Sequence, residues 1–277
     1  MTIFISSLIA SLALAITGSL TFWKVTAWYD FYIPIILFLA GYLGCIAIWW
    51  CLLWLFGRVY YKKEPYTKHS KWAKFWHNNG HRWLMVHANI KIKLTGREKL
   101  PTSSKYLLVS NHRSSFDSMT LTPALHTEDF AFITKPSNFK IPLFNRFMRG
   151  MCYMGIERDD PIQSLEVMKR AASLIENDVT NVVVYPEGTR GREGVIGEFH
   201  EGVFNIALRA KCPIVVVTTS GTENVRKKAP FKRTKVRIDI LGTLDYSMIE
   251  GQTAKAISDK VHKIMEEHLK KVAALGW

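Results

Sequence analysis

Hydrophobic residues follow two different patterns in this chain, one before and one after about residue 60. Residues 3–23 and 31–57 are apolar and contain no charged residue, whereas after residue 90 short apolar runs alternate with amphipathic stretches. A membrane-spanning helix needs about 20 apolar residues. The first pattern therefore predicts two membrane helices, and the second predicts a folded domain outside the bilayer.

The two apolar stretches are joined by residues 24–30, so they predict a helical hairpin that anchors the chain over residues 1–60. A signal peptide fits the first stretch poorly, because no basic residues precede it and a second apolar stretch follows at once. A hairpin that stays in one leaflet is an alternative, since Pro34, Gly41 and Gly44 interrupt the second stretch. Lys and Arg gather directly after the hairpin. The positive-inside rule then places the remaining chain on the cytoplasmic face of the inner membrane.

Residues 61–89 form a basic segment with amphipathic character. Its apolar residues fall near one helical face: Trp72, Phe75, Trp76, Trp83 and Val86. A basic amphipathic helix after a membrane span is typical of contact with anionic lipid at the interface. The same stripe could instead pack on the folded domain, and the two interpretations are compatible.

Residues 90–277 alternate strand-like and helix-like patterns. The runs that predict strands, several of them nearly continuous in hydrophobicity, are 90–95, 106–110, 130–135, 153–157, 181–185, 213–219 and 235–243. The stretches that predict helices are 115–126, 161–177, 201–210 and 252–273. Continuous apolar strands are buried on both faces. The alternation therefore predicts an α/β domain, with a mostly parallel sheet of about seven strands flanked by helices.

Charge narrows the choice of partner. The formal net charge is +14, and residues 226–237 contain seven basic residues and no acidic one. Such a chain favours an anionic lipid surface, a phosphorylated substrate, an acidic carrier protein or nucleic acid. The apolar stretches favour lipid, and the lack of a nucleic-acid-binding motif argues against nucleic acid. The four cysteines form no CxxC pair, which favours a reducing compartment.

Several common catalytic motifs are absent from the sequence. There is no G-x-S-x-G elbow, P-loop, G-x-G-x-x-G or H-E-x-x-H motif, so serine hydrolase, nucleotide-binding and zinc-protease functions lack support. Polar residues instead cluster directly after predicted strands. Active residues gather at the carboxyl ends of parallel strands, so these clusters are the candidates for the site.

The first cluster follows the run 106–110 and contains His112 and Asp117. A carboxylate can hold one imidazole nitrogen and leave the other free to accept a proton. Five residues is not a same-face helical spacing. The pair works only if His112 precedes a helix and Asp117 lies in its first turn, with Ser114 or Ser115 as the N-cap. An ordinary capping loop is the alternative for a His and Asp at this spacing.

Two further clusters supply arginines. Tyr185 is followed by Pro-Glu-Gly-Thr-Arg at 186–190, where Pro and Gly turn the chain sharply. Arg190 there and Arg158 after the run 153–157 both suit a phosphate, because guanidinium binds oxyanions in a bidentate manner. An ordinary surface turn is the alternative for residues 186–190, and a surface salt bridge to Asp159 or Asp160 is the alternative for Arg158.

Together these blocks resemble a known family. In order they are N-H-x4-D at 111–117, a strand ending in Arg158, P-E-G-T-R at 186–190 and a Pro-initiated apolar strand at 213–217. Their order and intervals are similar to those of the glycerolipid acyltransferases, whose bacterial members include the 1-acylglycerol-3-phosphate acyltransferases. Tyr185 stands where that family commonly has Phe.

The resemblance implies a mechanism. His112 would be the general base on the acceptor hydroxyl and Asp117 would orient it. The acyl group would pass directly from acyl-CoA or acyl carrier protein, with no covalent acyl-enzyme, metal or tightly bound cofactor. Backbone N–H groups near the 186–190 turn are candidate donors to the oxyanion. The residues implied for acceptor binding are Arg158, Glu187, Gly188, Thr189, Arg190 and, on a weaker match, Lys135.

The resulting expectation is acyl transfer to the sn-2 hydroxyl of 1-acylglycerol 3-phosphate, which gives phosphatidic acid. Glycerol 3-phosphate, another lysophospholipid or a lyso-aminolipid are alternative acceptors for the same chemistry. A non-catalytic membrane-surface protein is the alternative of another class, and it predicts that His112 and Asp117 are dispensable.

Overall fold

The computed structural model of the chain describes residues 2–21, 30, 32–59, 67–141, 144–191 and 195–275. The chain divides into two compact units, Met1–Tyr61 and Lys62–Trp277. Each unit is considered by itself below. The expected link at 24–30 lies outside the described residues, apart from Asp30.

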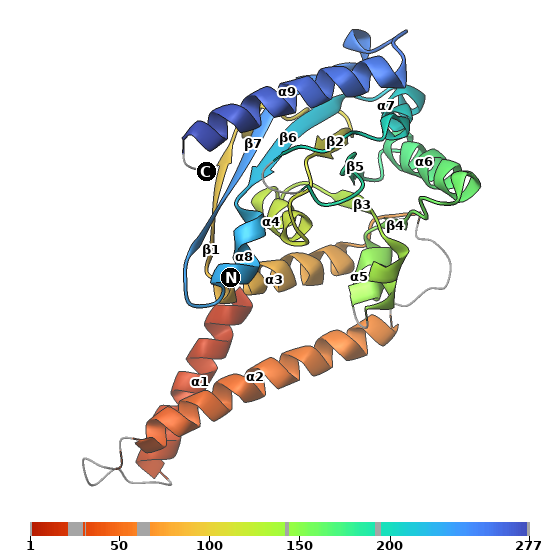
Figure 1. Cartoon of the computed structure of the whole chain (residues 1–277). Helices are drawn as coiled ribbons and strands as arrows, with labels where there is room; N and C mark the ends of the chain where they lie inside the picture. The colour runs from red at the N-terminus through yellow and green to blue at the C-terminus, as the bar shows by residue number, and fades with distance from the viewer. Residues whose placement is uncertain are drawn as a thin grey trace. The chain divides into compact units, whose positions relative to one another are not determined.

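The first unit is a pair of apolar helices, α1 (Thr2–Thr21) and α2 (Tyr32–Val59) (Figure 1). Glycine lets their backbones approach closely, because a Cβ on Gly41 would lie 2.9 Å from Leu14 Cδ2. Of the described helices, α2 is long and apolar enough over Tyr32–Leu55 to cross a membrane, whereas the apolar part of α1, Ile5–Thr21, is shorter. The two expected spans are thus unequal in length.

The second unit is built on a seven-stranded sheet with the order β1-β7-β6-β2-β5-β3-β4. The strands are β1 (Ile90–Thr95), β2 (Leu107–Ser110), β3 (Phe130–Thr134), β4 (Met154–Gly155), β5 (Asn181–Val184), β6 (Ile214–Ser220) and β7 (Thr234–Leu244). The strands from β6 to β4 run parallel to one another, while β7 is antiparallel to β6 and carries β1 parallel to itself. The predicted mostly parallel sheet is confirmed.

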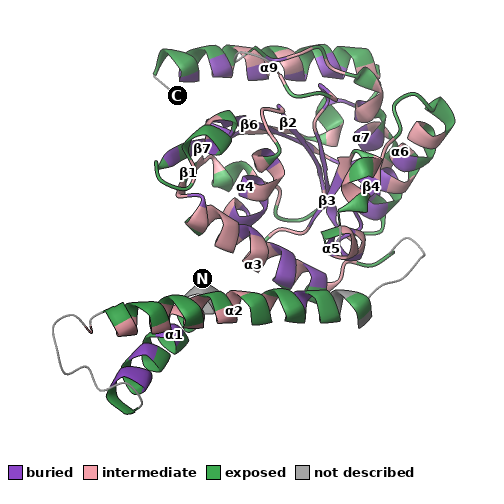
Figure 2. Ribbon diagram, turned by 60° about the horizontal axis from the view of Figure 1, so that its bottom comes forward, coloured by how far each residue is buried: buried purple, intermediate pink, exposed green. Residues whose placement is uncertain are grey.

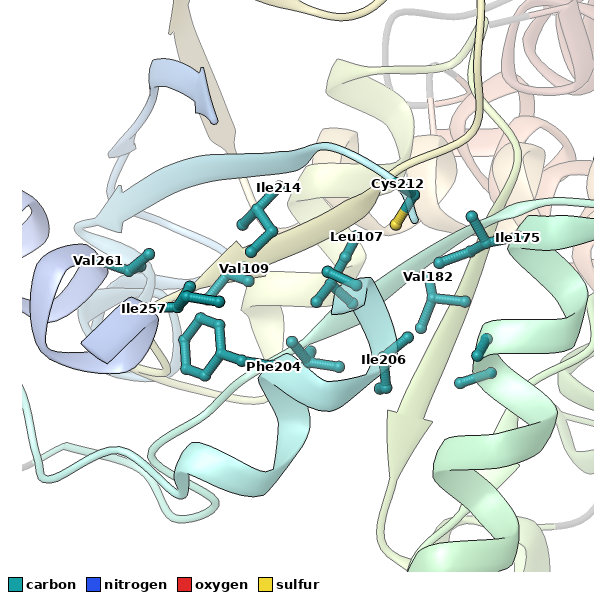
Figure 3. Close-up of a cluster of buried hydrophobic side chains, with 14 of the residues drawn as sticks. Leu107, Val109, Ile175, Val182, Phe204, Ile206, Cys212, Ile214, Ile257 and Val261 are labelled. Atoms are coloured by element: carbon teal, nitrogen blue, oxygen red, sulfur yellow. The ribbon is translucent and has the colours of Figure 1, made fainter. Parts of the chain in front are cut away.

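Helices cover both faces of this sheet (Figure 1). They are α3 (Lys71–His87), α4 (Phe116–Ala124), α5 (Phe144–Gly150), α6 (Pro161–Glu176), α7 (Asn205–Ala210), α8 (Val225–Lys228) and α9 (Ala254–Ala274). One buried cluster joins α6, α7 and α9 to β2, β5 and β6. In Figure 3, Ile257 and Val261 of α9 lie toward Val109 of β2. Figure 2 shows α9 buried along one side and exposed along the other, as its amphipathic sequence requires.

Two expected elements differ in extent. The run 153–157 forms only β4, because the Gln163 side chain of α6 takes over the next backbone groups. Gln163 Nε2 donates to the Gly155 carbonyl at 2.8 Å, and Glu157 N donates to Gln163 Oε1 at 2.9 Å. The stretch 201–210 splits into a 3₁₀ turn, Glu201–Phe204, and α7. The short helices α5 and α8 were not expected, since seven and four residues show too little periodicity.

The aromatic stripe of 69–88 does not lie on a single surface of α3. Trp76 is buried, together with Ala73, His77 and His81, whereas Trp72, Phe75 and Val86 are exposed. Part of the stripe therefore packs on the domain and part faces outward.

Candidate active site

The sequence-predicted site residues meet at one edge of the sheet. His112 follows β2, Lys135 follows β3, Arg158 follows β4, and the turn at 186–190 follows β5. These four strands are parallel neighbours, so their carboxyl ends lie side by side. The sheet topology therefore gathers four loops that are up to 78 positions apart in sequence (112 to 190).

His112 and Asp117 form a hydrogen-bonded pair. The His112 Nδ1–H donates to Asp117 Oδ2 at 2.8 Å, which assigns Nε2 as the unprotonated nitrogen of the neutral ring. Asp117 lies in the first turn of α4, and its carboxylate is buried. Ser115 is the N-cap position but makes no side-chain cap, and Ser114 Oγ accepts from Phe116 N at 3.1 Å instead.

The Asp117 carboxylate is held by three further donors. Arg113 N and Ser114 N donate to Oδ2 at 2.7 and 2.9 Å, and the Thr222 hydroxyl donates to Oδ1. A buried carboxylate is costly unless donors of this kind pair with its oxygens. Its orientation, and with it that of the imidazole, is thereby fixed from two separate segments of the chain.

Asn111, the residue before His112, ties two strand ends together. Its Nδ2 donates to the Thr219 carbonyl at 3.0 Å, and its Oδ1 accepts from Thr219 N at 2.7 Å. The reciprocal pair joins the end of β2 to β6. The loop that carries His112 thus starts from a fixed point.

Glu187 holds the backbone of His112 rather than facing the cavity. Its Oε1 accepts from His112 N at 2.7 Å, and its Oε2 accepts from Gly197 N at 2.9 Å. Gly191 N donates to the His112 carbonyl at 2.8 Å. Burial raises the pKa of the Glu187 carboxyl, while the two backbone N–H donors act in the opposite direction. Glu187 was expected to bind substrate, but the structure places both of its oxygens on backbone groups.

Replacing Glu187 with alanine should destabilise the fold. The N–H groups of His112 and Gly197 would lose their acceptor, at a cost of about 1–3 kcal/mol for each buried unpaired group. We expect a lower midpoint in thermal unfolding and reduced turnover, because His112 loses one of its backbone supports. Glu198→Ala, an exposed change in the neighbouring loop, is the matched control. An unchanged midpoint in Glu187→Ala would contradict this role.

Gly188 permits the sharp turn after β5. Its φ is +65°, and a Cβ there would lie 2.9 Å from His200 Cδ2 and 3.2 Å from Arg158 Cζ. Only glycine satisfies both the left-handed backbone and the close approach of these two side chains. The turn therefore brings Arg158 and His200 beside the 186–190 block.

Two backbone N–H groups of this turn donate to carbonyls of the same loop. Gly188 N donates to the Tyr185 carbonyl at 3.0 Å, and Thr189 N donates to the Glu187 carbonyl at 2.7 Å. The expectation that they are free to stabilise an oxyanion is therefore wrong for these two groups. The side chains of Thr189 and Arg190 are exposed and line the cavity instead.

A cavity of about 940 Å³ lies against these loops. His112, Lys135, Arg158 and Arg190 line one part of it. Apolar residues that line it include Met119, Phe132, Ile133, Ile141, Phe144, Met148, Ile156 and Met168. This combination of cations with an extended apolar wall matches a molecule that has an anionic head and a hydrocarbon chain.

Three features of the site were not found from the sequence. Tyr185 stacks on the His112 ring, with centroids 4.6 Å apart and planes 22° apart, and its hydroxyl is buried. Thr222 reaches Asp117 from 105 positions away. His77 and His81 of α3 also line the cavity. Their four-residue spacing on a helix was the available signal, but it lay within an aromatic-rich stripe that concealed it.

Comparison with known proteins finds similar acyltransferases. The family described as Acyltransferase matches residues 91–220. The chain is 32% identical over 165 residues to a chloroplastic 1-acyl-sn-glycerol-3-phosphate acyltransferase of Arabidopsis thaliana. The aligned region covers 58% of this chain and 44% of that protein. The chain is 24% identical over 166 residues to a 1-acyl-sn-glycerol-3-phosphate acyltransferase of Haemophilus influenzae, covering 60% and 69%. The match spans a little under half the length of the Arabidopsis relative.

A solved structure shares the fold. The 1-acyl-sn-glycerophosphate acyltransferase PlsC of Thermotoga maritima superposes with a TM-score of 0.58 at 22% identity, covering 74% of this chain and 79% of that chain. The fold class and the resemblance predicted from the sequence are both confirmed.

Proposed function

We propose that this chain, whose residues 91–220 match the Acyltransferase family, moves a fatty acyl group to the sn-2 hydroxyl of 1-acylglycerol 3-phosphate. The names of the relatives point to this acceptor. The observation that carries the proposal is the His112–Asp117 pair on the wall of a cavity that has both cationic and apolar parts.

The mechanism follows from the orientation of His112. Its Nε2 takes the proton of the acceptor hydroxyl as the oxygen attacks the thioester carbonyl. The tetrahedral intermediate then expels the thiolate, which takes the proton back from the imidazolium. Asp117 stabilises that imidazolium through Nδ1–H, because a buried carboxylate acts strongly at 2.8 Å. The thiol and the new ester leave with no covalent acyl-enzyme.

The cationic side chains suit the acceptor phosphate. Arg158 is brought beside Gly188, and Arg190 and Lys135 line the same cavity. Three cations near one wall favour a phosphate-bearing acceptor over a neutral or zwitterionic one. Thr189 is the hydroxyl within this group and can donate to the developing oxyanion.

The chain works at a membrane in this proposal. The apolar α2 supports membrane association, and the basic residues that follow it favour a catalytic domain on the cytoplasmic side of the inner membrane. In the second unit Phe231 is 91% exposed within the basic stretch 226–237. An exposed aromatic among Lys and Arg favours contact with anionic lipid headgroups.

Acyl transfer by the purified full chain in detergent tests the proposal. Labelled acyl-CoA and labelled acyl carrier protein are each offered with 1-acylglycerol 3-phosphate, glycerol 3-phosphate, other lysophospholipids and a lyso-aminolipid. Formation of phosphatidic acid at the highest kcat/KM supports the proposed acceptor. Preferred transfer to another acceptor would retain the chemistry and refute the acceptor. If folded protein transferred no acyl group from either donor, the proposal would be refuted in favour of a non-catalytic membrane-surface protein.

Arg158→Ala should weaken acceptor binding more than it slows catalysis. Loss of a charge-assisted hydrogen bond at this exposed position should raise the KM for 1-acylglycerol 3-phosphate about 10-fold, with little change in kcat. Steady-state kinetics with varied acceptor measure the effect. Monoacylglycerol lacks the phosphate and should show no such change, and Arg209→Ala on α7 is an exposed control. An equal KM for the phosphorylated acceptor in wild type and Arg158→Ala would remove Arg158 from the phosphate site.

A further inference from the structure

Three aromatic rings stack across three neighbouring strands at the imidazole of His112. His112 follows β2, Tyr185 follows β5 and Phe132 lies in β3, and the sheet order places β5 between the other two strands. The centroid of the Tyr185 ring lies 4.6 Å from that of His112 and 6.3 Å from that of Phe132, with planes 22° and 26° apart. Tyr185 therefore contacts the imidazole face to face and is itself in contact with a second ring.

The hydrogen bond to Asp117 fixes only part of the orientation of the imidazole. It holds Nδ1 of His112 at 2.8 Å, but a ring held at one atom can still tilt about that contact, and the terminal torsion of histidine has broad minima. The Tyr185 ring restricts this motion because it covers one face of the imidazole. A general base must lie within reach of the proton that it takes. Two contacts, one to Nδ1 and one to the ring face, thus set the direction of Nε2.

The same contact favours the charged form of the base. An aromatic face carries negative charge density and attracts a cation within about 6 Å of the ring centroid, and the imidazole lies at 4.6 Å. In the proposed reaction His112 is neutral before transfer and an imidazolium while the thioester is attacked. The attraction to Tyr185 is therefore stronger in the transition state than in the substrate complex. Interactions of this kind raise the rate of the chemical step rather than the affinity for substrate.

The hydroxyl of Tyr185 takes no part in this contact. Its oxygen is buried and has no hydrogen-bond partner among the described residues, so it does not reach the cavity. Burial holds the pKa of Tyr185 well above its ordinary value, and the side chain stays protonated and neutral. The ring alone is left to act on His112, and a phenylalanine would present the same face.

We propose that Tyr185 is a positioning residue for the general base: its ring fixes the plane of the His112 imidazole and stabilises the imidazolium that forms during acyl transfer. This inference rests on the proposed function, because it takes His112 to be the base. It gives Tyr185 a role in the rate of the chemical step and none in substrate affinity.

Replacing Tyr185 with leucine or with phenylalanine separates the ring from the hydroxyl. Leucine is apolar but has no aromatic face, whereas phenylalanine keeps the face and lacks the hydroxyl. In single-turnover kinetics with saturating 1-acylglycerol 3-phosphate, Tyr185→Leu should lower the rate constant of acyl transfer about 10-fold, within the range of a cation held over an aromatic ring. The KM values of both substrates should be unchanged, and Tyr185→Phe should keep the wild-type rate constant.

Two further variants guard against an effect of folding. Tyr246→Leu is the matched control, because it makes the same change in a partly buried tyrosine of the turn Tyr246–Met248, which does not line the cavity. It should leave the rate constant unaltered. Tyr185→Met, which also lacks an aromatic face, replaces the leucine variant if circular dichroism shows that the latter is unfolded. The inference is wrong if the variant without an aromatic face keeps the wild-type rate constant, if Tyr185→Phe loses as much, or if the loss lies in KM.

A measurement on His112 alone keeps this test separate from the proposed reaction. The full chain in detergent carries histidine isotope-labelled at Cε1, and the magnetic resonance signal that is missing from His112→Ala identifies His112. A proton held over an aromatic face is shielded, so the Hε1 signal should lie upfield in wild type and Tyr185→Phe and move downfield in Tyr185→Leu. If this shift is found but no acceptor is acylated, the proposed acyl transfer fails and the positioning of His112 by Tyr185 stands. Equal signal positions in the three proteins would overturn the inference whatever the catalytic result.

Discussion

His112→Ala is expected to lower the kcat of acyl transfer by about 10²–10⁴-fold, the usual contribution of a positioned general base. The change removes the imidazole that Asp117 orients, and with it the nitrogen that accepts the proton of the acceptor hydroxyl. The measurement is the steady-state turnover number with both acceptor and donor at saturating concentration. Substrate affinity should change little, because the cations that hold the phosphate are untouched.

The fold should survive this substitution. Glu187 and Gly191 bind the backbone of residue 112 rather than its side chain, and Asp117 keeps the donors Arg113 N and Ser114 N. Circular dichroism and the unfolding midpoint should therefore match wild type. His126→Ala, which alters an exposed histidine between α4 and β3, is the control. Wild-type turnover in His112→Ala would eliminate His112 as the base.

Asp117→Asn should lower turnover by about 10²–10⁴-fold, in the range found when a base loses its orienting carboxylate. The amide oxygen can still accept from His112 Nδ1–H and the two backbone N–H groups. The amide NH₂ can face the Thr222 hydroxyl, which is able to rotate and accept. The main loss is then the negative charge that stabilises the imidazolium.

Two comparisons isolate that charge effect. Asp178→Asn changes an exposed aspartate of the same domain and should leave kcat unaltered. Thr222→Val removes the hydroxyl donor but keeps the carboxylate, so its loss of turnover should be smaller than that of Asp117→Asn. If Asp117→Asn and Thr222→Val had equal, small effects, Asp117 would serve only to hold the loop.

Much of the fold could be predicted because buried parallel strands leave a clear pattern. The runs at 181–185 and 213–219 are almost wholly apolar, and they form β5 and β6, whose residues are buried throughout. The direction of a strand leaves no comparable trace. β7 alternates charged residues (Lys235, Arg237, Asp239) with apolar ones, but such alternation does not give strand direction, so the reversal of β7 and β1 relative to the other strands appeared only in the structure.

The catalytic pair could be predicted from the sequence for a different reason. His112 and Asp117 lie five positions apart at a strand-to-helix junction, so local geometry alone brings them together. Thr222 and Glu187 act on this pair from 105 and 75 positions away, and only the folded sheet makes them neighbours. The hydrogen bonds from Glu187 to two backbone N–H groups could not be predicted for this reason, since backbone partners carry no residue-type signal.

His77 and His81 illustrate a third limit. Their helix was predicted, but periodicity only gathered its large aromatic residues near one face and said nothing of the two histidines. The structure buries Trp76 beside the two histidines and exposes Trp72 and Phe75. Burial of a polar residue depends on what surrounds it, and for this pair the surroundings are a cavity wall built from Tyr153 and Phe132, which are distant in sequence.

The central claim is that the His112–Asp117 pair transfers an acyl group to the hydroxyl of a phosphate-bearing lysolipid. The most direct measurement is phosphatidic acid formed from 1-acylglycerol 3-phosphate by the purified full chain, beside His112→Ala at equal concentration and with either acyl-CoA or acyl carrier protein as donor. We predict steady product formation by wild type and product near background with the variant, although both proteins are folded. Equal product from the two proteins, or none from folded wild type with either donor, would contradict the account.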